Sequence, residues 1–148
     1  MRKLRVLLLV SLLAMLTVAA TASASATGGR PLTASLTGAA EVPTTGDPDG
    51  SGSAMITVNH GLGKVCYRIA VTGIVLPAGA AHIHVGDAGV AGPVVVTLTA
   101  PDATGIASGC ADVTRALAKA LIQNPTHYYV NVHNSVYQGG ALRGQLTR

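Results

Sequence analysis

Apolar and polar residues alternate along several short segments of this chain, and glycine, proline or asparagine separates most of these segments. Val65 and Ile69, for example, fall on one side of such a segment, and Arg68 falls on the other. A period of two is typical of β-strands that pack one face against a core. The expected strands are Leu32–Leu36, Ser53–Val58, Lys64–Thr72, Ala81–Val85, Val94–Thr99, His127–His133 and Leu142–Leu146.

One segment has helical spacing instead. Its apolar residues recur every three or four positions and would share one face of a helix: Val113, Leu117, Ala120 and Leu121. Asp112 is a residue type that caps helix N-termini, and Asn124–Pro125 would end the helix. The pattern therefore predicts one helix over about Asp112–Asn124.

Short strands, regular turns and a single helix together predict an all-β fold. We expect an antiparallel, Greek-key-like β-sandwich with one inserted helix. The chain contains no phenylalanine or tryptophan and four tyrosines. Its core must therefore consist mainly of valine, isoleucine, leucine and alanine.

The N-terminal residues follow a different pattern. A cationic start, Met1–Arg5, precedes the apolar run Val6–Ala20 and the small residues Ala24–Ala26. This layout predicts a signal peptide over residues 1–26 that is cleaved after Ala26. The apolar run is shorter than the roughly 20 residues that span a bilayer. We therefore expect a secreted protein with one domain, residues 27–148, and no membrane association after cleavage.

Charge and cysteine content limit the expected partners and predict a cross-link. Three of the ten basic residues lie in the predicted signal peptide, so the remainder is close to neutral. The sequence has no basic stripe with interleaved aromatic residues, and we expect no nucleic-acid partner. Cys66 and Cys110 both belong to the exported part, which predicts one disulfide bond. Two buried free thiols are the alternative.

Histidines are the most suggestive candidates for chemistry. His82 and His84 are two positions apart and would share one face of a strand. His133 lies on another expected strand, on the face opposite its apolar residues. If the strands are neighbours, three imidazoles meet at one place. Such a set could bind copper or zinc and leave one coordination position open.

Other polar residues share this expected face. They are Tyr129, Asn131, Arg143 and Gln145. Around a metal they would fix the orientation of the histidine rings. The alternative is a polar face without metal, on which the histidines hydrogen-bond to neighbours or water. No catalytic residues are predicted, since no serine lies in a G-x-S-x-G motif and no compact pair of carboxylates occurs.

Two long stretches resemble the CHRD domain, a module named after chordin and found alone in many secreted bacterial proteins. They are "AAHIHVGDAGVAGPVVVTL" and "NPTHYYVNVHNSVYQGGALRGQL". They supply the pieces of the family pattern: His82, His84, Gly86, Gly92–Pro93, Asn124–Pro125, Tyr129, Asn131, His133 and Arg143–Gln145. The opening "LTGAAEVPTTGDPDGSGSAMITV", with Glu41 and Pro43, resembles the start of the family. The resemblance extends over about Leu32 to Leu146 and implies an extracellular module.

Three functional hypotheses follow. The first is a secreted, non-enzymatic binding module whose histidines hold copper or zinc. The second is an extracellular module that binds another protein and has no metal. The third is a mononuclear copper enzyme resembling superoxide dismutase, although the chain lacks the further histidines and the aspartate of a two-metal site. The expected partner is a metal ion or an unidentified extracellular protein.

Overall fold

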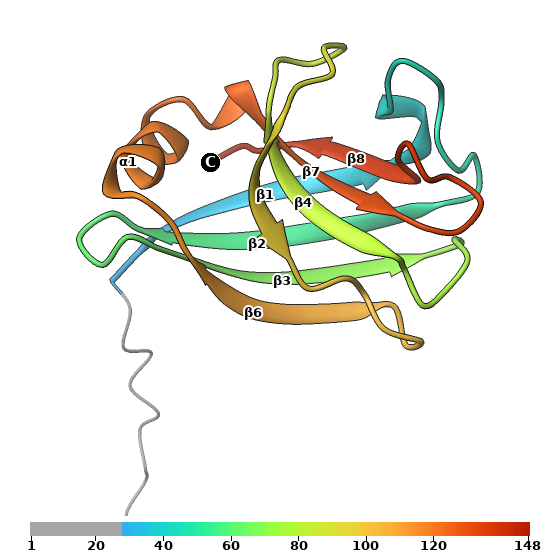
Figure 1. Ribbon diagram of the computed structural model, residues 1–148, viewed down its shortest axis with the longest axis horizontal. Helices are drawn as coiled ribbons and strands as arrows, with labels where there is room; N and C mark the ends of the chain where they lie inside the picture. The colour runs from blue at the N-terminus through green and yellow to red at the C-terminus, as the bar shows by residue number, and fades with distance from the viewer. Residues whose placement is uncertain (1–27) are drawn as a thin grey trace, which may run out of the picture.

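The computed structural model describes residues 28–148 and contains one long sheet and one α-helix (Figure 1). The predicted signal peptide, residues 1–26, lies outside the described residues. The strands are β1 (Arg30–Thr37), β2 (Ser51–Asn59), β3 (Lys64–Thr72), β4 (Ala80–Val85), β5 (Val94–Leu98), β6 (Ile106–Asp112), β7 (Tyr128–His133) and β8 (Leu142–Gln145). The helix is α1 (Arg115–Gln123), and the short 3-10 turns are η1 (Gly38–Ala40) and η2 (Pro125–His127).

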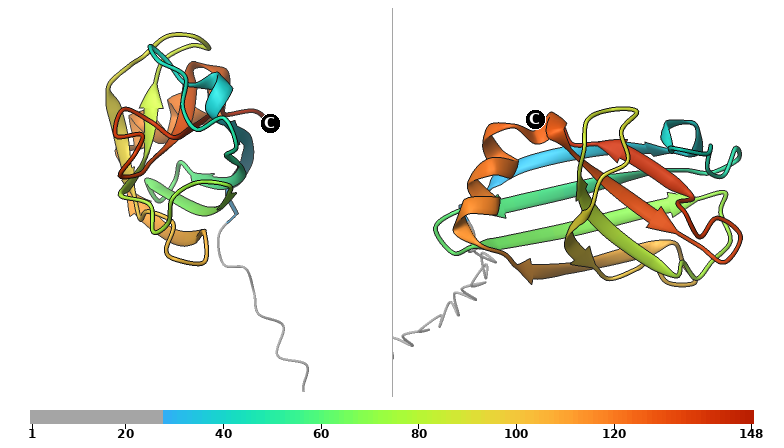
Figure 2. Two further views of the ribbon diagram at one scale, coloured as in Figure 1. Left: turned by 90° about the vertical axis from the view of Figure 1, so that its right-hand side faces the viewer. Right: turned by 45° about the horizontal axis from the view of Figure 1, so that its top comes forward.

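The eight strands form one antiparallel sheet in the order β5-β4-β7-β8-β1-β2-β3-β6. The sheet folds over on itself, so that β4, β5, β7 and β8 face β1, β2, β3 and β6 (Figure 2). We call these two sets the histidine layer and the disulfide layer. They are continuous where Thr37 of β1 pairs with Arg143 of β8. The expectation of an antiparallel, sandwich-like all-β fold is confirmed.

The core lies between the two layers. Ala54, Ile56 and Val58 of β2 are each 1% exposed, as their alternation predicts. Ile83 of β4 and Val130 of β7 meet them from the histidine layer and are fully buried. Burial of these aliphatic side chains is the main stabilising contribution to such a fold. The absence of large aromatic residues other than tyrosine therefore does not prevent a continuous core.

A strand that the sequence pattern did not predict, β6, forms one edge of the sheet. Only Ala107 of this strand is buried, so the apolar alternation is weak. The strand has a glycine, Gly109, opposite Tyr67. A Cβ atom on residue 109 would lie only 2.7 Å from the hydroxyl oxygen of Tyr67, so a larger residue would clash there. The Tyr67 hydroxyl in turn accepts a hydrogen bond from the backbone N–H of Thr99, just after β5, at 2.7 Å. This contact joins the two layers near their edges.

The single predicted helix is confirmed and ends before Asn124 as expected, but the predicted N-cap, Asp112, is wrong. Asp112 is the last residue of β6 and forms an ion pair with Lys64 at 2.7 Å. The helix begins three residues later, because the side chain of Thr114 caps it by accepting a hydrogen bond from Leu117 N–H at 3.1 Å. Leu121 is buried as expected, and Ala118 joins it. The helix packs across the ends of β2 and β3 (Figure 1).

The predicted disulfide is confirmed. Cys66 of β3 and Cys110 of β6 are directly opposite each other in the register, and their sulfur atoms are bonded. The bond therefore fastens the edge strand β6 to its neighbour. Among residues 28–148, no helix is both long and apolar enough to cross a membrane.

Candidate metal centre

Three histidines converge on the outer face of the histidine layer. His82 and His84 lie on β4 with Ile83 between them, and Ile83 points into the core. In the register of β4 and β7, His133 is opposite Ala80, which brings it next to His82. The ring centroids of His82 and His133 are 5.2 Å apart, and those of His82 and His84 are 5.6 Å apart. One nitrogen from each histidine can be chosen so that all three lie within 4.8 Å of one another.

Backbone carbonyl groups orient two of the three rings. His84 Nδ1 is 2.8 Å from the carbonyl oxygen of Gly92, and His133 Nδ1 is 3.0 Å from that of Gln138. A carbonyl oxygen only accepts hydrogen bonds, so each Nδ1 carries the proton. The lone pairs of His84 and His133 therefore lie on Nε2, which is the tautomer that ligates a metal through Nε2. His133 Nε2 is within hydrogen-bonding distance of His82 Nδ1, whereas His84 Nε2 has no partner.

The positions of the ring nitrogen atoms also suit a copper or zinc ion. His84 Nε2 is buried and has no hydrogen-bond partner. His133 Nε2 lies 3.3 Å from His82 Nδ1, close to the separation of about 3.3 Å between two ligands of a tetrahedral ion with bonds of about 2.05 Å. Three imidazole nitrogens are a donor set that suits both zinc and copper.

The surroundings favour the neutral forms of His82 and His84. Burial lowers the pKa of His82 below its ordinary value of 6.5, and nearby His133 and His84 lower it further. Burial also lowers the pKa of His84, against the opposing effect of its hydrogen bond to Gly92, while His133 and Arg143 add to the lowering. Neutral imidazoles are the form that binds a metal, so these shifts favour ligation at neutral pH.

Tyr129 lies directly beside the cluster. Its ring stacks on that of His84, with centroids 4.8 Å apart and an interplanar angle of 11°. The guanidinium carbon of Arg143 lies 3.5 Å from the centroid of the Tyr129 ring. Arg143 thus contacts the cluster through Tyr129, and its charge is engaged by an aromatic face and by backbone carbonyls.

Asn131 binds a residue that the sequence pattern did not single out for this site. Its Nδ2 donates to Glu41 Oε2 at 2.7 Å, and Glu41 Oε1 accepts from Val42 N–H at 3.1 Å. Glu41 is only 5% exposed, and burial raises the pKa of its carboxyl group. Because Glu41 lies outside every strand, no periodicity could indicate that it folds onto β7.

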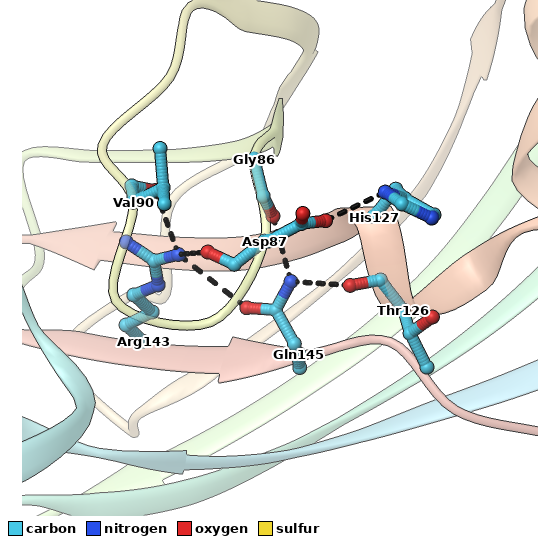
Figure 3. A network of polar contacts seen from close by, with 7 residues as sticks. All are labelled: Gly86, Asp87, Val90, Thr126, His127, Arg143 and Gln145. Atoms are coloured by element: carbon cyan, nitrogen blue, oxygen red, sulfur yellow. Dashed lines mark hydrogen bonds and ion pairs between the residues drawn. The ribbon is translucent and has the colours of Figure 1, made fainter.

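Gln145 holds the loop between β4 and β5, Gly86–Pro93, which we call the strap. Its Nε2 donates to Gly86 O and Thr126 O, both at 2.7 Å (Figure 3). Gln145 therefore contacts the loop rather than a histidine ring. His127 is exposed, and its Nδ1 lies 2.6 Å from Asp87 Oδ1 of the strap.

These observations describe an antiparallel β-domain with one disulfide bond and a polar, histidine-bearing face. The CHRD domain family matches residues 32–146, and the chain therefore belongs to this family. No curated protein and no solved structure matches the chain. Family membership and the disulfide are both consistent with an extracytoplasmic protein.

Proposed function

We propose that this protein is a secreted, non-enzymatic CHRD module that binds one copper or zinc ion through His82, His84 and His133. The observation that carries the proposal is the buried Nε2 of His84, which has no partner although the ring is fixed by Gly92 O. A buried polar atom without a partner is costly, and a metal would satisfy it. The pre-set tautomer of His133 supports the same conclusion.

Two further parts of the proposal concern export and the surrounding residues. Secretion follows from the signal peptide over residues 1–26, which would be removed after Ala26. Tyr129 is proposed to fix the His84 ring by stacking, while Asn131, Arg143 and Gln145 would hold the segments around it. Mass spectrometry of the exported protein tests the first statement, because cleavage elsewhere would give a different mass.

Metal analysis of the purified mature protein tests the site itself. After equilibration with copper or zinc and dialysis, we expect one equivalent to remain bound. His84→Ala and His133→Ala should each remove most of this binding, because each deletes one of three ligands. His60→Ala is the matched control, since His60 is exposed on the β2–β3 turn. No retained metal in the native protein, or an equal loss in the control, would contradict the proposal and leave a metal-free interaction module.

A further inference from the structure

One buried arginine holds the first part of the strap. Arg143 Nη2 donates to the carbonyl oxygens of Asp87 at 2.8 Å and Val90 at 2.9 Å (Figure 3). Its side chain is 1% exposed, although it starts from the outer face of β8. Arg143 and Gln145 together therefore fix the strap from the side that faces the sheet.

The last part of the strap reaches His84. Gly92 O accepts the hydrogen bond from His84 Nδ1 at 2.8 Å, while Gly92 N–H donates to the Tyr129 hydroxyl at 3.1 Å. Arg143 also lies over the Tyr129 ring. Two routes thus connect the guanidinium to the same imidazole. One runs along the strap to Gly92, and the other runs through the Tyr129 ring that stacks on His84.

The strap has little freedom to follow another path. A Cβ atom on Gly92 would lie 1.7 Å from the carbonyl oxygen of Val85, so only glycine permits this close approach. Val85 N–H also donates to Pro93 O at 3.1 Å. The position of the Gly92 carbonyl therefore depends on contacts at both ends of the strap.

We propose that Arg143 is a positioning residue for the histidine cluster. It acts through the strap and Tyr129 to keep the Gly92 carbonyl on His84 Nδ1, and so places the free lone pair of His84 on Nε2. The consequence for metal affinity rests on the proposed function, whereas the consequence for the tautomer does not. Partners that orient a metal-binding histidine typically change metal affinity by about 10–100-fold when they are removed.

The test combines a metal-free and a metal-bound measurement. In the chelator-treated native protein, ¹⁵N-resolved NMR of the histidine rings should show His84 with its proton on Nδ1 only. Arg143→Met should give a mixture of both tautomers and weaken copper or zinc binding by about 10–100-fold. Arg143→Lys, which keeps the charge and hydrogen-bond donors, should restore part of the Nδ1 population. Arg68→Met is the control, because Arg68 is exposed on β3 of the other layer.

A folded Arg143→Met protein with an unchanged His84 tautomer overturns the positioning role. Should that variant fail to fold, Gly92→Ala provides the second test, because its Cβ displaces the same carbonyl without altering Arg143. It must also yield mixed tautomers, and an unchanged tautomer again overturns the role. If the native protein binds neither metal but the tautomer shifts as expected, the proposed function fails and the positioning role stands.

Discussion

The two layers of the sheet differ in how far their outer faces are buried. In the disulfide layer, buried and accessible positions alternate along β3, and the outward residue Arg68 is exposed. In the histidine layer, β7 is buried at five consecutive positions, and Arg143 of β8 is 1% exposed. Both layers contribute apolar residues to the same core. The difference therefore lies only in what covers the other side.

Loops cover the outer face of the histidine layer. The strap lies across Tyr129 and Arg143, while the β1–β2 loop brings Glu41 onto Asn131. Burying polar groups in this way costs free energy unless each group finds a partner. Most of them have one, and the exceptions in this part of the molecule include His84 Nε2. A polar face that is both covered and incompletely satisfied is where a ligand is to be expected.

The largest expected difference in stability is between the two arginines. Arg143→Met removes a buried cation and leaves the Asp87 and Val90 carbonyls without their charged donor. We expect a loss of about 3–5 kcal/mol in the free energy of unfolding, because hydrogen bonds to charged groups contribute about 1.5–3 kcal/mol each. Arg68→Met, on the uncovered face, should stay within about 0.5 kcal/mol of the native value. Urea unfolding measures both, and equal effects would show that the outer faces do not differ.

The disulfide provides the next comparison. Replacing both Cys66 and Cys110 with alanine should lower the free energy of unfolding by about 2–4 kcal/mol, because the unfolded chain loses a cross-link. Metal binding should be unchanged, since the histidines belong to the other layer. Urea unfolding and metal titration of the same preparation check this pair of outcomes. A parallel loss of metal binding would mean that the histidine layer depends on the β3–β6 edge.

The sequence predicted all four strands of the histidine layer but not what covers them, and in the disulfide layer it missed β6. Alternation identified the inward residues of β2 and β3, because one face of these strands is buried and the other is accessible. It also placed His82, His84 and His133 on a common polar face. It could not show that this face is covered, since the covering groups are a loop carboxylate, Glu41, and backbone carbonyls such as that of Gly92. A backbone carbonyl carries no residue-specific signal.

A dependence on pH should separate the covered histidines from an exposed one. The pKa values of His82 and His84 in the folded protein lie below the ordinary value of 6.5. As pH falls below about 6.5, the unfolded chain takes up protons that the folded metal-free protein resists, so stability decreases. Glu41, whose pKa is raised above its ordinary value of 4.5, acts in the opposite sense as pH falls toward 4.5.

Urea unfolding of the chelator-treated protein between pH 5 and 8 therefore has a defined expected result. The free energy of unfolding should fall from pH 7 to pH 5, and His82→Gln should make this fall shallower. His60→Gln should leave the slope as it is, because His60 is exposed. If His82→Gln left this pH dependence unchanged, the burial of the histidines would be contradicted, because the opposing contribution of Glu41 is the same in both proteins.

The smallest expected effect concerns the helix that follows the edge strand. Thr114→Ala removes the side-chain oxygen that accepts from Leu117 N–H, and should cost about 1 kcal/mol in the free energy of unfolding. Asp112→Asn should cost less than about 0.5 kcal/mol, since it loses only an ion pair to Lys64 whose carboxylate side is 85% exposed. Urea unfolding at low and high salt separates them. Because the cap is a hydrogen bond between neutral groups, the Thr114→Ala effect should persist in high salt, whereas that of Asp112→Asn should vanish. If Thr114→Ala instead had no effect at either salt concentration, Thr114 would not be capping the helix.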